Sequence, residues 1–150
     1  MPESAERDET QQDRNVTVVR RFIDGWVNGG DLDVIDETWS EDISWQGGSL
    51  GSYHGRDAFK EFTKANAAGA FTGMHLEIHE LIAHGDKVVA RFTNSGTNTG
   101  PFLNNPATGK HAEWLGIGIY TVRDGRITEG WFAEDILGVL LQLGAISMPA

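Results

Sequence analysis

The C-terminal stretch EGWFAEDILGVLLQLG holds residues whose types and spacing favour acid–base chemistry. Successive residues of a β-strand point to opposite faces, so Trp131 and Asp135 would point the same way on a regular strand. A carboxylate that faces an apolar, tryptophan-lined space loses hydration, which raises its pKa toward neutrality. Such a carboxylate can both donate and accept protons near neutral pH. The pattern therefore makes Asp135 a candidate general acid or base.

A structural role for Asp135 stays open beside the catalytic one. A short helix is expected from Ile136 to Leu143, closed by Gly144. Asp is a favoured N-cap residue, because its carboxylate accepts hydrogen bonds from the free amides of the first helical turn. Spacing alone is compatible with capping and with catalysis.

The elements that would position these residues follow from hydrophobic periodicity. The expected order is helices at 16–27 and about 32–39, a strand at 43–46, a helix at about 57–69, strands at 75–83, 87–97, 112–123 and 126–133, and a helix at 136–143. Asp124-Gly125 predicts a two-residue hairpin turn, whose central positions need φ > 0. Helices followed by an antiparallel meander indicate an α+β fold. We expect a curved antiparallel sheet wrapped around helices, a cone-shaped α+β barrel with an internal pocket.

Length and charge limit the classes of function. The 150 residues suit one domain at 15–150, preceded by a polar segment at 1–14 that is expected to be a disordered tail. The net charge of -10 opposes binding to nucleic acid and to anionic membranes. No apolar run is long enough to span a bilayer, and the first residues lack the features of a signal peptide. With 0 Cys, a cytoplasmic location is expected.

Aromatic and histidine residues suggest the rest of a site. Trp45 and Trp131 lie on predicted strands near the pocket, where flat rings would stack on a flat polycyclic ligand. His54, before the third helix, is a candidate pocket residue. His75, Glu77 and His79 share one strand face but lack further ligands, so we interpret them as a solvated face and predict no metal site.

Several segments together resemble the SnoaL-like polyketide cyclases, within the nuclear-transport-factor-2-like superfamily. The resemblance covers nearly the whole chain after residue 14 and rests on FIDGWVNGGDLDVIDETW, HGRDAFKEF, FTNSGTNTGPF, PATGK and DGRITEGWFAED followed by LGVLLQLG. It implies the cone fold, a homo-oligomer built through the sheets, and an Asp after the last strand that acts as acid/base without metal or cofactor. By motif alignment, that residue is Asp135.

The sequence departs from the family at several polar positions. Family members commonly carry His where this chain has Asn98 and Gln46, and the aldol cyclases carry polar partners where it has Ile119 and Thr121. Amides form hydrogen bonds but do not titrate. Asp135 would then be the acid/base, with Asn98, Gln46 or Arg91 orienting a carbonyl or enolate. The predicted substrate-binding residues are Trp45, Trp131, Arg91, His54, Phe62 and Ile119.

The resemblance favours intramolecular aldol ring closure on a polycyclic aromatic substrate of the anthracycline type, without any cofactor. Cofactor-independent hydroxylation of the same scaffold is the alternative, and a partner reductase stays open. A non-catalytic ligand-binding or scaffold module is a second alternative, since this fold also serves association. Epoxide hydrolysis would need a second carboxylate, so Glu113 or Glu129 would have to point inward.

Overall fold

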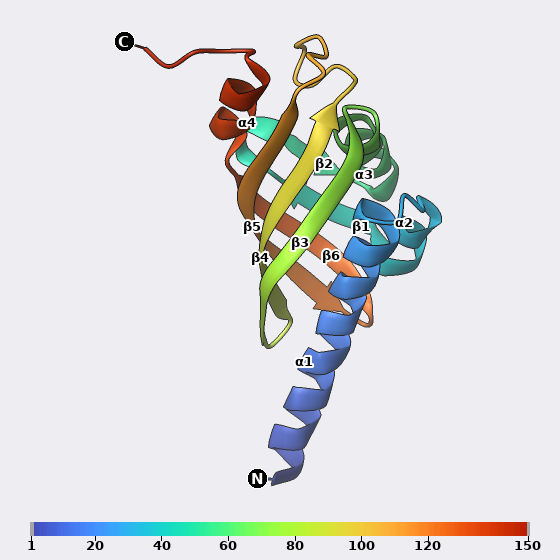
Figure 1. Ribbon diagram of the computed structural model, residues 1–150. Helices are drawn as coiled ribbons and strands as arrows, with labels where there is room; N and C mark the ends of the chain where they lie inside the picture. The colour runs from blue at the N-terminus through green and yellow to red at the C-terminus, as the bar shows by residue number, and fades with distance from the viewer. Residues whose placement is uncertain (1, 150) are drawn as a thin grey trace.

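A curved sheet, helices on its inner side and a last helix at one end make up the fold (Figure 1). The structure is a computed structural model that describes the backbone of residues 2–149 and the side chains of residues 10–149. The elements are α1 (Pro2–Phe22), η1 (Ile23–Val27), α2 (Asp33–Thr38), β1 (Trp39–Gln46), η2 (Gly48–Leu50), β2 (Ser52–His54), α3 (Arg56–Thr63), η3 (Lys64–Ala68), β3 (Phe71–His84), β4 (Lys87–Asn98), β5 (His111–Arg123), β6 (Arg126–Glu134) and α4 (Ile136–Leu143). The segments η1 and η3 are π-helical continuations of α1 and α3, and η2 is a 3₁₀ turn.

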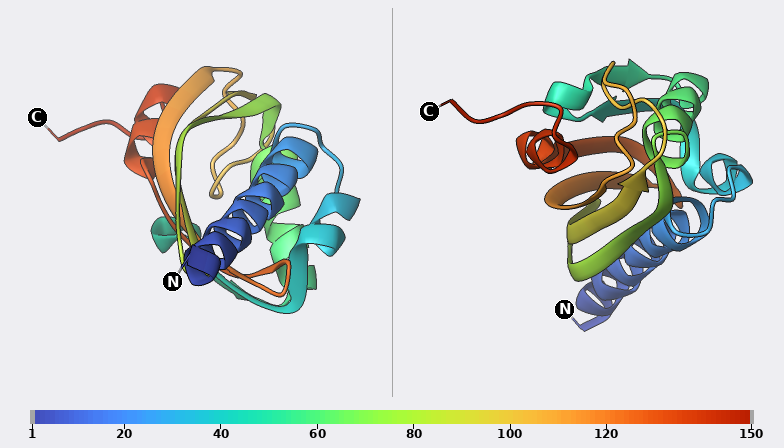
Figure 2. Two further views of the ribbon diagram at one scale, coloured as in Figure 1. Left: turned by 90° about the horizontal axis from the view of Figure 1, so that it is seen from below. Right: turned by 45° about the horizontal axis from the view of Figure 1, so that its top comes forward.

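Within the described residues the six strands form one sheet in the order β2-β1-β6-β5-β4-β3. The strands pair antiparallel, except that β1 and β6 run parallel. The sheet bends around α1 and α3 without closing, as both views in Figure 2 show. The expected α+β cone is therefore confirmed, but the sheet is mixed and the barrel is open.

The hairpin predicted at Asp124-Gly125 is confirmed. Both residues have positive φ, 52° and 77°, and Arg123 pairs with Arg126 across the turn. Further along the same hairpin the register shifts, because Thr121 pairs with Glu129 whereas Val122 pairs with Ile127. Thr128 is therefore an extra residue on β6. Such a β-bulge changes which residues face the core, and this one decides the orientation of the candidate site below.

The helix α1 lies across the concave face of the sheet and supplies much of the core. Its inward residues Val19 and Phe22 are buried, as are Ile23 and Trp26 of η1, as the 3.6-residue periodicity predicts. The helix begins at Pro2, so it includes the segment up to residue 14 that was expected to be a disordered tail. The secondary structure therefore shows no boundary near residue 15, and the division into tail and domain stays a prediction.

The first strand differs most from the expected boundaries. Trp39 was expected on the second helix but begins β1, where it is fully buried and its ring lies 4.4 Å from that of Phe59. β1 pairs with β6, which lies about ninety residues further along the chain, and with the short strand β2, which was not predicted. Pairing over such a distance leaves little trace in local periodicity, so the strand could not be bounded from local sequence.

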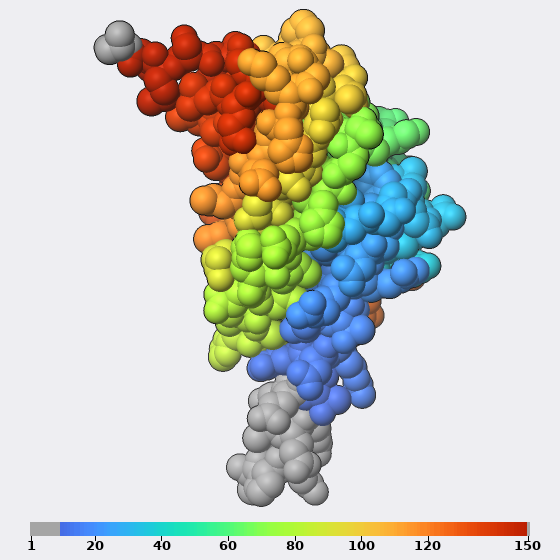
Figure 3. All heavy atoms as spheres, in the orientation of Figure 1, coloured from blue at the N-terminus to red at the C-terminus, as the bar shows by residue number. Residues whose placement is uncertain are grey.

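One end of the molecule is formed by α4, the C-terminal segment and the loop between β4 and β5 (Figure 3). None of the described helices is long and apolar enough to cross a membrane.

Candidate functional site

A cavity lies between the concave face of the sheet and the helices α1 and α3. It has about 100 Å³ open to the centres of water-sized molecules, and about 700 Å³ when all space out to its mouth is included. The enclosed part, about 100 Å³, is smaller than the roughly 300–1,000 Å³ typical of small-molecule sites, so a larger ligand would extend through the mouth of the cavity. Its walls are mostly apolar, and their aromatic residues include Trp45, Phe59, Phe62, Phe92, Phe102 and Phe132.

A polar cluster interrupts this apolar wall where β4, β5 and β6 lie side by side. Oε1 of Glu134 accepts hydrogen bonds from Nδ2 of Asn94 and from Nε1 of Trp114, both at 2.9 Å. Asn94 and Trp114 are direct partners in the β4–β5 ladder, and Glu134 pairs with Gly116 on the other side of β5. The sheet register therefore brings together three residues that are far apart in sequence.

The environment of Glu134 changes its ionisation. Burial raises the pKa of this carboxyl above its ordinary value, and the hydrogen bonds from Trp114 and Asn94 lower it by less. By its accessible surface Glu134 is half-buried, and it lines the cavity. Because both hydrogen bonds go to Oε1, Oε2 is the oxygen left to exchange a proton with a ligand. A carboxylate with a raised pKa suits general acid–base chemistry.

Tyr120, on β5, adds a hydrogen-bond donor to the same cavity. Its side chain is buried, and no protein partner for its hydroxyl is found in the described part of the chain. Burial raises the pKa of the phenol, and the charge of Glu134 raises it further. Tyr120 therefore stays protonated and can donate a hydrogen bond to a ligand oxygen.

Glycines on the inner face of β5 make room for this cluster. A Cβ on Gly116 would lie 2.6 Å from the ring of Phe92 and 2.9 Å from Cγ of Glu134, and one on Gly118 would lie 2.5 Å from the ring of Phe132. The alternation in LGIGIY thus leaves space opposite the inward side chains of β4 and β6.

Asp135 does not face the cavity, so its predicted orientation is wrong. Its side chain is exposed and accepts a hydrogen bond from the backbone N–H of Gly138 at 2.9 Å. This is the N-cap of α4, the structural alternative that the sequence left open. A Cβ on Gly138 would lie 2.3 Å from the carboxylate, so glycine is required for this close approach.

The bulge explains why the prediction chose the wrong carboxylate. Before the bulge the odd-numbered residue Ile127 is buried, whereas after it the even-numbered Gly130 and Phe132 are buried and Glu134 lines the cavity. Trp131 and Asp135 do share a face, as predicted, but that face is outward, and Trp131 is 48% exposed. A one-residue shift moves every following side chain to the other face. The G-x-F-x-E alternation was the available signal for Glu134.

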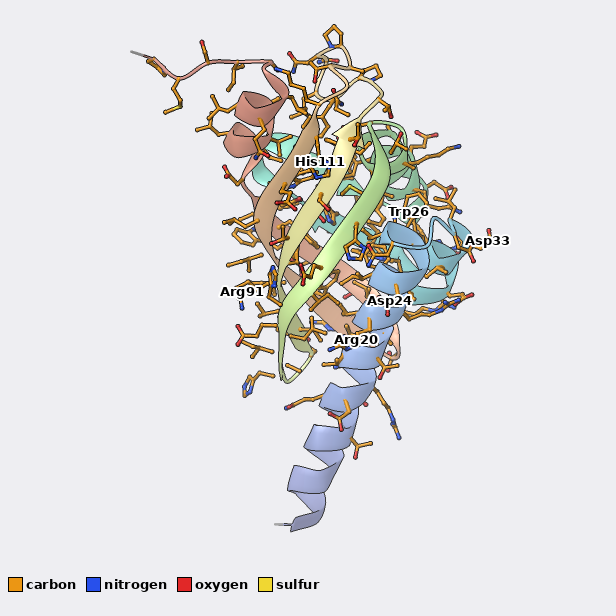
Figure 4. All side chains as sticks on the ribbon, viewed as in Figure 1. Arg20, Asp24, Trp26, Asp33, Arg91 and His111 are labelled. Carbon is orange, nitrogen blue, oxygen red and sulfur yellow. The ribbon has the colours of Figure 1, made fainter. Side chains whose placement is uncertain are left out.

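The other predicted site residues divide between the two faces. Trp45 and Phe62 line the cavity, and so does Trp114 on β5. Gln46, His54 and Arg91 are exposed and Ile119 is half-buried, and none of the four lines the cavity. His54 lies 3.2 Å from the hydroxyl of Ser44, and Arg91 forms an ion pair with Glu80 on the outer side of the sheet (Figure 4).

Asn98 is buried, but it holds a loop instead of lining the cavity. Its Nδ2 donates to the carbonyls of Ala70 and Gly100, and its Oδ1 accepts from the backbone N–H of Thr108. These contacts close the base of the loop between β4 and β5, which places Phe102 in the cavity wall. Its predicted contact with a reacting group is therefore not seen.

Two further chemistries were considered from the sequence. Glu113 and Glu129 are exposed, so neither supplies the inward second carboxylate required for the epoxide hydrolase alternative. His75, Glu77 and His79 are exposed, as the solvated-face interpretation predicts. Among the described residues no group of three or more potential ligands could hold a metal ion.

Comparison with known proteins identifies the family. The family model of the SnoaL-like polyketide cyclases matches residues 16–143. This chain belongs to the SnoaL-like polyketide cyclase family. Membership supports an enzyme role in polyketide tailoring. No curated protein matches the sequence significantly.

Solved structures with the same fold include proteins assigned as polyketide cyclases. A structure assigned to the SnoaL-like polyketide cyclases from Jannaschia sp. CCS1 is 26% identical, with a TM-score of 0.82, 91% of this chain covered and 95% of that one. One assigned as a polyketide cyclase from Bacillus cereus ATCC 10987 is 32% identical, with a TM-score of 0.72 and coverage of 89% and 83%. IdmH from Streptomyces antibioticus, also assigned as a polyketide cyclase, is 28% identical, with a TM-score of 0.71 and coverage of 87% and 98%.

Proposed function

We propose that this protein is a polyketide-tailoring enzyme in which Glu134 acts as general acid and base beside a carbonyl of a polycyclic aromatic substrate. The observation that carries the proposal is the half-buried carboxyl of Glu134, which lines an apolar cavity and accepts two hydrogen bonds through Oε1, so that Oε2 stays without a protein donor among the described residues. Desolvation raises its pKa, which brings its basicity closer to that needed at neutral pH. This proposal moves the acid/base role from Asp135 to its neighbour.

The favoured reaction is intramolecular aldol ring closure. Oε2 of ionised Glu134 removes a proton from a carbon next to a carbonyl, and the electron pair moves into the enolate. The enolate carbon attacks a second carbonyl, which forms the C–C bond and places the π electrons on oxygen. This oxygen takes the proton back from Glu134, so the carboxylate is regenerated. Tyr120 would stabilise the oxyanion by donating a hydrogen bond from its phenol.

The aromatic walls support a flat substrate, of the anthracycline type expected from the sequence. Trp45, Phe62 and Phe132 enclose the cavity, and the rings of Trp45 and Phe132 stack on each other 5.5 Å apart. Offset stacking on such rings adds about 0.5–1.5 kcal/mol per pair beyond area burial. The cavity would also exclude water from the enolate and hold the two reacting carbons together.

The test uses a small aromatic ketone, 2-tetralone, whose α-protons exchange with solvent through an enolate. Deuterium uptake in D₂O is followed by proton NMR for the wild-type protein, Glu134→Gln and Asp135→Asn. Gln keeps an oxygen that can accept from Asn94 and Trp114 but cannot take a proton, so we expect a loss of about 10²–10⁴-fold. Asn keeps the helix cap, so Asp135→Asn should retain exchange.

Unchanged exchange in Glu134→Gln, or loss only in Asp135→Asn, would refute the assignment. Ligand binding without any catalysed exchange would favour the binding-module alternative. A product that forms only when dioxygen is supplied would favour hydroxylation of the same scaffold.

We further propose that the protein forms a homo-oligomer through the outer face of the sheet. This proposal is supported by large apolar side chains that stay exposed on adjacent strands. Leu115 is 64% exposed and Ile117 is 42% exposed on β5, and Trp131, 48% exposed on β6, pairs with the half-buried Ile119 further along β5. A contiguous apolar surface of this kind is typical of association sites.

A further inference from the structure

The side-chain oxygen of Asn94 is buried in the wall of the cavity without a hydrogen-bond donor. Asn94 is 5% exposed and lines the cavity, and its Nδ2 donates a 2.9 Å hydrogen bond to Oε1 of Glu134. Its Oδ1 has no partner among the described residues. Buried polar atoms are nearly always paired, and one left unpaired costs free energy comparable to a lost hydrogen bond.

The contact with Glu134 determines which end of the Asn94 amide is unpaired. Oε1 of Glu134 also accepts from Trp114, and it can accept from Asn94 only if Nδ2 points toward it. Turning the amide over would place Oδ1 against a carboxyl oxygen that already accepts one hydrogen bond. The acceptor is therefore directed away from Glu134, while the amide remains part of the cavity wall.

The other polar groups that line the cavity do not supply the missing donor. The hydroxyl of Thr63 is bonded to Nε1 of Trp26, and Nδ2 of Asn66 donates to the carbonyl of Phe62. Nε1 of Trp114 is bonded to Glu134. No bond joins the phenol of Tyr120 to Asn94 in the described structure. Asn94 therefore carries an unpaired acceptor in the cavity wall, although neighbouring atoms enclose Oδ1 almost completely, so a bound molecule would pair it only after a small shift of those atoms.

We propose that Asn94 is a specificity-determining residue whose Oδ1 accepts a hydrogen bond from a hydroxyl group on the ring system of the ligand. The ligand class is then a phenol or an enol, because an aromatic ether or a bare hydrocarbon has no hydrogen to donate. The inference rests on the proposed function only in placing the ligand in this cavity. Since Asn94 and Glu134 are hydrogen-bonded, the hydroxyl would lie next to the carboxyl that moves the proton.

The test compares 2-naphthol with 2-methylnaphthalene, which has the same shape but carries methyl in place of hydroxyl. Dissociation constants are measured for wild type, Asn94→Leu, Glu134→Gln and Asn66→Leu. Leu has nearly the shape of Asn and no acceptor. For each variant we divide the dissociation constant of 2-methylnaphthalene by that of 2-naphthol. We expect this ratio to be at least tenfold higher in wild type than in Asn94→Leu, a difference of about 1.4 kcal/mol. Comparing ratios cancels the different hydrophobicity of the two ligands.

The other variants show which group recognises the hydroxyl. Asn66→Leu removes a second cavity amide and should leave the ratio at its wild-type value. Glu134→Gln keeps an oxygen toward Asn94 and should also leave it unchanged, although 2-tetralone exchange is lost. A preference that disappears in Glu134→Gln and persists in Asn94→Leu would make Glu134 the acceptor and overturn the inference. Equal ratios in wild type and Asn94→Leu would overturn it too, with solvent as the partner of Oδ1.

Folding is checked by thermal unfolding of each variant. If Asn94→Leu does not fold, Asn94→Ala replaces it with the same expected change in ratio. Failure of the proposed function would appear as unchanged exchange in Glu134→Gln, which is a separate readout from the binding ratio.

Discussion

Gly116→Ala should damage the candidate site through a single methyl group. The added Cβ would lie 2.9 Å from Cγ of Glu134 and 2.6 Å from Cζ of Phe92, whereas ordinary contact begins at 3.4 Å. Glu134 and Phe92 must therefore move by about 0.5 Å and 0.8 Å. Overpacking of this kind costs about 1–3 kcal/mol, partly offset by about 0.5–1 kcal/mol because Ala is less flexible than Gly in a strand. A displacement near 1 Å can cost about 10²-fold in rate, so we expect a 10- to 100-fold loss.

Gly118→Ala is the matched control for this prediction. It lies on the same face of β5, two residues away, and its Cβ would meet only the ring of Phe132 among the nearest atoms. Unfolding in urea should show a similar loss of stability for both variants, while 2-tetralone exchange should fall much more in Gly116→Ala. Equal losses of exchange would mean that packing in general, and not the position of Glu134, limits the reaction.

Three further predictions concern the cap, the ionisation of Glu134 and the outer face. Asp135→Ala should lower the free energy of unfolding by about 1 kcal/mol through loss of the hydrogen bond from Gly138, whereas Asp135→Asn should keep this hydrogen bond. A loss of 2-tetralone exchange in a folded Asp135 variant would instead indicate a chemical role for Asp135. The folded-state pKa of Glu134 is raised, so between the ordinary carboxyl pKa and this raised pKa the native state binds more protons than the unfolded state. The contribution of Glu134 to stability is therefore lost as pH rises through the folded-state pKa. Thermal unfolding across pH should show this decline in wild type and not in Glu134→Gln, and parallel curves would contradict the assignment. Ile117→Lys should convert an oligomer to monomers in sedimentation velocity without unfolding, and an unchanged sedimentation coefficient would exclude the outer face as the interface.

Local patterns were enough to predict most of the elements. The 3.6-residue repeat in VTVVRRFIDGWV determines an amphipathic helix, and Asp124-Gly125 determines a hairpin, because each depends on residues close together in the chain. The last helix, Ile136–Leu143, was predicted with its observed bounds. The family could also be recognised, since its motifs are short segments in a fixed order.

The inward carboxylate was decided by the tertiary structure. The sequence indicated that Trp131 and Asp135 share a face, and they do, but the bulge at Thr128 determines which face is inward. A bulge depends on how two strands pair, and β6 is held on its other side by β1, which joins it from far away in the chain. Asn94, Trp114 and Glu134 meet only because this register aligns three strands, and no local pattern contains that information. The sequence by itself therefore determined the elements and their periodicity, whereas the pairing of distant strands decided which side chains meet in the cavity.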